Sequence, residues 1–141
     1  MRTTSADQEL ATRLRLAVTR SARRLRQEAS TDLSPTLTAA LATIERHGPL
    51  TPSELATRER VQRPTVTRLA VRLEEAELVT RAADPGDRRS ALITVTPAGR
   101  ALLATARTRK DAFLSARLDA LPAADRRTLE RAAALLEGML E

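Results

Sequence analysis

Arginine supplies most of the side chains in this sequence that could bind a charged partner. Of the 24 basic residues only Lys110 is a lysine, and the formal net charge at pH 7 is +6. A guanidinium group is planar, stays protonated and donates in a fixed fork that fits phosphate oxygens and the edge of guanine. GC-rich coding would explain arginine in place of lysine, but it does not explain the excess of positive charge. A basic domain of this kind is expected to bind a polyanion.

Side chains for catalysis or metal binding are scarce. The sequence contains no cysteine and one histidine, His47, so the usual nucleophile–base pairs and thiolate ligands are nearly excluded. It also lacks a glycine-rich phosphate loop, a paired-histidine zinc motif and an aspartate-rich calcium loop. We expect no enzyme activity, no cofactor and no metal. His47 is expected to end a helix, where the dipole favours positive charge, with effector sensing or a pH response as the alternative.

The arginines best placed to read a nucleic acid are expected on a short helix from about Arg63 to Glu75. Helical spacing separates an apolar stripe from an exposed face. The stripe consists of Val66, Leu69, Ala70 and Leu73. The opposite face consists of Pro64, Arg68 and Glu75, flanked by Thr65, Val71 and Arg72. An exposed face led by threonine and arginine is what a helix needs to reach base edges in the major groove.

A β-hairpin is expected directly after this helix. Residues 78–81 and 91–95 are rich in β-branched side chains and predict two paired strands, joined by a turn-rich loop at 84–90. Arg88 and Arg89 would lie at its charged tip. The candidate DNA contacts on the helix and the hairpin are Gln62, Arg63, Pro64, Thr65, Thr67, Arg68, Arg72, Arg88 and Arg89.

Capping patterns mark the remaining helices. Ser5 with Gln8 predicts a helix from about 6 to 28, and Ser34 before Pro35 begins one that Gly48-Pro49 stops after His47. The Thr51-Pro52-Ser53-Glu54 capping box opens a short helix. Thr96-Pro97 opens a helix that runs to about 120, and a last helix follows Pro122. The fold class is therefore mainly α with a small two-stranded β wing, a winged helix-turn-helix flanked by terminal helices.

The chain is expected to form a single domain over 1–141. Its DNA-binding part covers about 34–96, and dimerisation helices cover about 5–28 and 97–141. The terminal helices carry apolar stripes wider than one small domain is expected to bury alone, which predicts an obligate homodimer. These stripes are Leu10, Leu14 and Val18, and Leu129, Leu136 and Met139. With no signal peptide and no run of roughly 20 apolar residues, we expect a cytoplasmic protein without membrane contact.

Residues 61–103 closely resemble the MarR family of transcriptional regulators. The resemblance rests on Pro-Thr-Val-Thr-Arg in the helix, Asp-Pro-Gly-Asp-Arg-Arg-Ser in the hairpin and Thr-Pro-Ala-Gly-Arg after it. It implies a homodimer that binds double-stranded DNA at a palindromic operator, with residues 63–75 as the recognition helix. In the wing, Asp87 would orient an arginine, and Arg88 or Arg89 would reach into the minor groove. Many members repress genes and release DNA when a small anionic or aromatic effector binds.

Two positions depart from the family pattern. Glu77 stands where members commonly have the glycine that suits a left-handed turn, so it either strains or alters that turn. Gln62, a poor capping residue, stands where a serine or similar cap usually opens the recognition helix. Both departures could shift the recognition helix slightly.

Other interpretations remain open for several residues. Arg72 could be a solvated surface residue, whereas Arg68 and Arg89 are expected to contact DNA. Asp87 is expected to shape the turn, because a carboxylate faces phosphates unfavourably. Phe113 is expected to anchor a dimer core, with stacking against a ligand as the alternative. For the whole protein, the alternative is a winged-helix module for protein–protein interaction without DNA binding, which would need an apolar or acidic recognition face.

Overall fold

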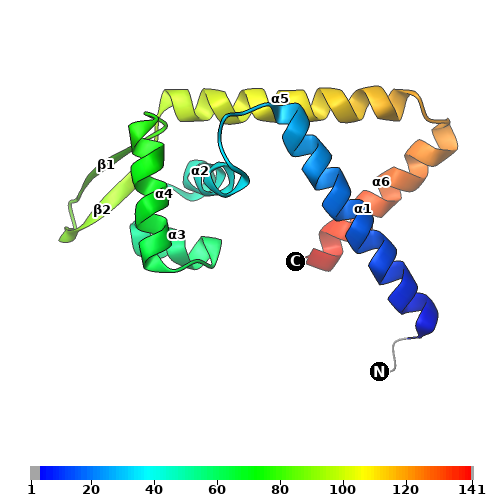
Figure 1. Ribbon diagram of the computed structural model, residues 1–141, viewed down its shortest axis with the longest axis horizontal. Coiled ribbons are helices and arrows are strands. Elements are labelled where there is room, and N and C mark those ends of the chain that lie inside the picture. Colours follow the sequence, from blue (N-terminus) through cyan, green and yellow to red (C-terminus); the bar gives the residue numbers. More distant parts are fainter. Residues whose placement is uncertain (1–3, 141) are drawn as a thin grey trace. The chain divides into compact units, whose positions relative to one another are not determined.

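The structure, a computed structural model, describes residues 4–140. In chain order its elements are α1 (Ser5–Ala29), α2 (Pro35–His47), α3 (Pro52–Glu59), α4 (Arg63–Glu75), β1 (Val79–Asp84), β2 (Asp87–Val95), α5 (Pro97–Asp119) and α6 (Ala123–Leu140) (Figure 1). The strands form a two-stranded antiparallel sheet. The predicted fold class, mainly helical with a two-stranded wing, is confirmed.

The chain divides into two compact units. One is the segment 29–107, and the other combines the described parts of 1–28 and 108–141, so that α5 contributes to both. The boundary expected between residues 96 and 97 falls inside the segment 29–107, and the roles of the two parts in DNA binding and dimerisation stay predictions. That the whole chain behaves as one domain stays a prediction.

The unit 29–107 is built on an aliphatic core. Helices α2, α3 and α4 pack together beside the base of the hairpin (Figure 1). The connection between α2 and α3 adds to the sheet, because Leu50 and Ile93 exchange backbone hydrogen bonds of 3.0 and 2.7 Å. The largest side chains that are fully buried are Leu41, Ile44, Leu55, Val66, Leu73, Val79 and Ile93. Removing such side chains from water supplies the main driving force for folding this unit.

The expected caps begin the helices of this unit. The Ser34 hydroxyl accepts from the Leu37 N–H at 3.2 Å, and Thr51 and Glu54 form the reciprocal capping box. At the start of α5, the Thr96 hydroxyl accepts from the Gly99 N–H at 3.1 Å. Gly99 is also needed for packing, because a Cβ there would lie 2.3 Å from the Leu78 carbonyl oxygen. These bonds satisfy amide groups that lack partners in the first turn of a helix.

The cap predicted for the first helix was wrong by one residue. Thr4 takes this role in place of Ser5: its hydroxyl accepts from the Asp7 N–H, and its own N–H donates to the Asp7 carboxylate, both at 3.2 Å. The hydroxyl also donates to that carboxylate at 2.6 Å, which lowers the pKa of Asp7. An ionised carboxylate three residues after the cap is a stronger acceptor than the Gln8 amide, and it also complements the helix dipole.

The hairpin loop is shorter than predicted. Residues 87–90 were expected in the loop, but they belong to β2, because the chain reverses at Pro85 and Gly86. The Asp84 carboxylate accepts from the Gly86 N–H at 2.9 Å and closes the turn locally. Asp84 pairs with Asp87 and Ala83 with Ala91, so Arg88, Arg89 and Ser90 form an irregular, bulged segment. A bulge twists a strand and redirects its side chains.

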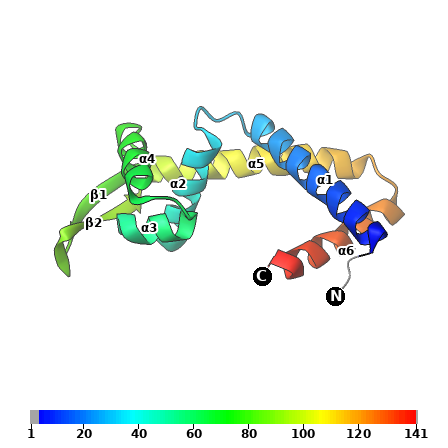
Figure 2. The same ribbon diagram turned by 60° about the horizontal axis from the view of Figure 1, so that its bottom comes forward.

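The unit formed by α1, the end of α5 and α6 buries very little apolar surface. No described residue of α6 is buried, and the only buried residue of α1 is Ala29 at its end. The chain turns between α5 and α6 at Leu121 and Pro122 (Figure 2). Large apolar side chains remain exposed throughout this unit: Leu10, Leu14, Leu16, Val18, Leu114, Leu118, Leu129, Leu135, Met139 and Leu140.

Candidate nucleic-acid interface

Helix α4 presents the polar face that its sequence predicts. Its apolar stripe, formed by Val66, Leu69, Ala70 and Leu73, is buried. Of the candidate contacts on this helix and its cap, Thr65 is half-buried and the others are exposed: Gln62, Arg63, Pro64, Thr67, Arg68 and Arg72. The buried stripe therefore holds the helix against the core and turns the basic face to solvent.

The start of α4 is held by side chains other than its cap residue. Gln62 makes no side-chain capping bond, as expected for a poor cap. Arg63 instead donates from Nη1 to the Ser53 hydroxyl at 2.6 Å and ties α4 to the start of α3. Arg60, at the end of α3, takes a left-handed conformation with φ of 55°, which bends the chain into α4. This turn places α3 and α4 in the arrangement of a helix-turn-helix.

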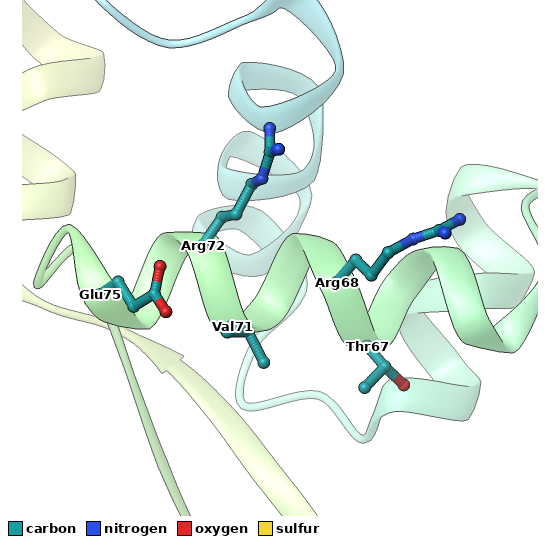
Figure 3. A pocket seen from close by; sticks show the side chains of 5 residues that line it. All are labelled: Thr67, Arg68, Val71, Arg72 and Glu75. Atoms are coloured by element: carbon teal, nitrogen blue, oxygen red, sulfur yellow. The ribbon is translucent and has the colours of Figure 1, made fainter.

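Arg68 and Arg72 carry charges that other side chains leave available. Within residues 4–140 the described ion pairs involve neither of them. Both line a shallow, open hollow of about 310 Å³ on the outer face of α4, together with Thr67, Val71 and Glu75 (Figure 3). Val71 and Glu75 were missed as candidate contacts, although helical spacing places them on the exposed face. The candidate contacts were predicted mainly from positive charge and polarity, which do not indicate an apolar or an acidic residue.

The wing carries two further exposed arginines. Arg88 and Arg89 lie in the bulged segment of β2, and neither takes part in an ion pair described for residues 4–140. The Asp87 carboxylate accepts from the backbone N–H of Arg89 at 3.0 Å. Asp87 thus orders the backbone that carries Arg89. An effect on the direction of the guanidinium group itself stays a prediction.

A third arginine of the hairpin, Arg81, is neutralised. It forms a bidentate pair with Glu74 of α4, with Nε to Oε2 at 2.8 Å and Nη2 to Oε1 at 3.1 Å. These hydrogen bonds lower the pKa of Glu74 and raise that of Arg81. The pair links α4 to β1, the first strand of the wing. Sequence patterns did not predict this pair. Glu74 and Arg81 are seven residues apart with a turn between them, and such a spacing gives no periodic signal.

Glu77 lies in the left-handed conformation that glycine usually takes. Its φ is 61°, and its N–H donates to the Glu74 carbonyl while the Leu78 N–H donates to the Leu73 carbonyl, both at 2.9 Å. This is the Schellman arrangement that ends many helices. The Thr96 hydroxyl donates to the Glu77 carbonyl at 2.7 Å. The turn keeps the geometry typical of glycine, so Glu77 carries the strain of a left-handed non-glycine residue.

A helix-turn-helix with an exposed basic second helix, followed by a two-stranded basic wing, defines a winged-helix DNA-binding protein. The model of the MarR family matches residues 33–91. An HTH-type transcriptional regulator of Mycobacterium tuberculosis is 36% identical over 137 residues, which cover 96% of each chain. The chain belongs to the MarR family and is a DNA-binding transcriptional regulator.

Solved structures agree with this assignment. A Pseudomonas aeruginosa protein that carries the name of a transcriptional regulator superposes with a TM-score of 0.89 at 34% identity, over 98% of both chains. A Staphylococcus aureus MepR variant bound to an oligodeoxyribonucleotide shares the fold, with a TM-score of 0.73 at 19% identity over 94% of this chain and 98% of that one. Within residues 4–140, each helix is too short or too polar to span a lipid bilayer.

Proposed function

We propose that this regulator binds a palindromic operator as a homodimer, with α4 in the major groove and the wing beside it. The observation that carries the proposal is the outer face of α4, where exposed Arg68 and Arg72 lie outside the ion pairs described for residues 4–140, beside polar and apolar side chains. The major groove is about 12 Å wide and admits one helix. A guanidinium fork there reads the O6 and N7 atoms of guanine.

The wing adds charge to the same interface. Arg88 and Arg89 are exposed on a bulged strand, within reach of phosphates or a narrow minor groove. Contacts of this kind respond to charge and groove width, and they discriminate sequence weakly. Gln62, Arg63, Pro64, Thr65 and Thr67 surround the start of α4, where contacts with the backbone or with base edges are expected.

The homodimer is supported by the exposed apolar side chains of α1 and α6. Leu135 and Met139 are 58% and 72% exposed in the single chain, and a second copy is the partner that two-fold symmetry supplies. A symmetric dimer reads two half-sites about one helical turn apart, centre to centre. Repression and release by a small anionic or aromatic effector stay predictions that rest on the family. A cytoplasmic location stays a prediction that rests on the sequence.

The experiment is selection of bound sequences from a random duplex pool by the full chain, followed by affinity measurements on the selected operator. We expect an imperfect palindrome. Arg68→Ala should cost about 1–3 kcal/mol on the operator and relax preference at one base position. Arg13→Ala, which removes the same charge from the exposed surface of α1, is the matched control and should bind as the wild type does.

Two results would count against this function. If Arg68→Ala lowers affinity equally for operator and random DNA, Arg68 contacts phosphate only. If no sequence is enriched and binding to duplex DNA does not depend on salt, the winged helix serves protein–protein contact instead. The basic face of α4 argues against that alternative, which would need an apolar or acidic surface.

A further inference from the structure

Val71 is an apolar side chain on the polar side of α4. It lies half-buried and away from the buried stripe of the helix, so the core does not account for it. Its neighbours in the shallow hollow are Thr67, Arg68, Arg72 and Glu75. A branched apolar group surrounded by charged and polar side chains offers one apolar contact to whatever binds this face.

The side chains that line the hollow form two edges. Thr67 and Val71 project from one side of α4, and Arg68 and Arg72 project from the other (Figure 3). The Thr67 hydroxyl donates to the Arg63 carbonyl at 3.2 Å, and its methyl group is turned toward Val71 (Figure 3). The helix therefore offers methyl groups along one edge and guanidinium groups along the other.

We propose that the edge formed by Thr67 and Val71 reads the 5-methyl group of a thymine, and that Val71 is a specificity-determining residue. This inference rests on the proposed reading of the major groove by α4. Thymine is the only standard base that presents a methyl group there. Arg68 and Arg72 supply the positive charge that brings a phosphate-lined groove against this edge, which favours DNA over an apolar protein surface.

The test compares thymine with uracil, which lacks only the 5-methyl group. Operator duplexes carry uracil in place of each thymine in turn, and affinities are measured for the wild-type protein, Val71→Ala and Val71→Ile. Uracil at one position in one half-site should weaken wild-type binding about 4-fold, as expected for the loss of one buried methyl group. Uracil at that position in both half-sites removes two methyl groups and should weaken binding about 15-fold. Uracil outside the footprint is the control on the DNA side.

The two variants connect that methyl group to Val71. Val71→Ala should bind thymine and uracil duplexes equally at this position while still preferring operator to random DNA. Val71→Ile keeps a branched apolar side chain and should retain the discrimination. Equal melting temperatures would show that both variants fold.

The outcomes separate this inference from the proposed function. If the wild type binds a selected operator but distinguishes no uracil position, or if Val71→Ala keeps the discrimination, the inference fails and sequence-specific binding stands. If the chain enriches no sequence at all, the proposed function fails and the inference fails with it.

Discussion

The two units of this chain use similar apolar residues in opposite ways. In 29–107 the large aliphatic side chains are buried, as with Leu41 at 0% exposure, and the surface is polar and basic. In the unit formed by α1, the end of α5 and α6, leucines stay exposed, as with Leu135 at 58%. The first unit contains its own core, whereas the second leaves an apolar surface that needs a partner. One chain thus combines a unit with its own core, for which we propose DNA binding, with a unit for which we propose dimerisation.

The largest expected effect comes from charging the exposed apolar surface. The double variant Val18→Glu/Leu129→Glu places two carboxylates on this surface of each protomer. A dimer would have to bury all four carboxylates without partners, and burying each one costs several kcal/mol. We expect a monomer at micromolar concentration by sedimentation, with operator affinity lower by roughly 100-fold because two half-sites are no longer joined. Ala39→Glu, an exposed site on α2, is the control and should remain dimeric. A stable dimer of the double variant would contradict this role for α1 and α6.

Shortening a leucine to alanine should lower the free energy of unfolding strongly in the unit 29–107 and only weakly in the unit formed by α1, the end of α5 and α6. Leu41→Ala leaves a cavity in a fully buried site and should lower the free energy of unfolding by about 2–5 kcal/mol in denaturant titrations. In the monomeric double variant, Leu135→Ala should change stability by less than about 1 kcal/mol, because this side chain is mostly exposed within the chain. Equal destabilisation at both positions would mean that Leu135 packs inside a single chain after all.

The arginines of the wing should contribute to DNA binding, whereas the arginines of the unit formed by α1, the end of α5 and α6 should not. Arg88→Ala/Arg89→Ala should weaken operator and random DNA binding together. The slope of log affinity against log salt should flatten by about 0.9 for each phosphate that a subunit of the variant no longer binds. Arg126→Ala/Arg127→Ala removes an adjacent exposed pair from α6 and should leave the slope unchanged. If the wing variant keeps its affinity and its slope, the wing does not touch DNA and the α4 helices supply the binding.

The smallest expected effect is a gain in stability at Glu77. Its left-handed conformation is strained for a residue with a Cβ, and glycine relieves this strain at an entropic cost in the unfolded chain. Glu77→Gly should therefore raise the free energy of unfolding by about 0.5–1 kcal/mol. Glu77→Ala keeps the Cβ and should show no such gain. A destabilised glycine variant would indicate that the Glu77 side chain makes a contact worth more than the strain.

Local patterns were enough to predict the helices and their order. Ser34, Thr51 and Thr96 begin their helices as expected, because a capping side chain and the amides it satisfies lie within three residues of each other. The buried stripe of α4 followed from its 3.6-residue period. The candidate arginines of α4 were identified from the same period, since the face opposite a buried stripe is exposed. Their contacts with DNA stay predictions.

Features that depend on competition or on distant partners were not predictable in this way. Both Thr4 and Ser5 could cap α1, and the strength of the Asp7 acceptor decided between them. The hairpin turn closed early and drew residues 87–90 into β2, because the Asp84 side chain stabilises a tight reversal. Two local options of similar free energy are decided by small differences that sequence patterns do not resolve.

The sequence by itself determined the class of protein. The order of its helices, the hairpin after α4 and the apolar stripes follow from local propensity and periodicity, and the positive charge follows from composition. Only the tertiary structure decided which charges stay available. Glu74 neutralises Arg81, whereas the ion pairs described for residues 4–140 include neither Arg68 nor Arg88, and Val71 lies in the hollow beside Arg68. Such pairings depend on where the end of α4 meets the first strand of the wing. The distance between the side chains of Glu74 and Arg81 is set by the packing of the core, and no repeat in the sequence encodes it.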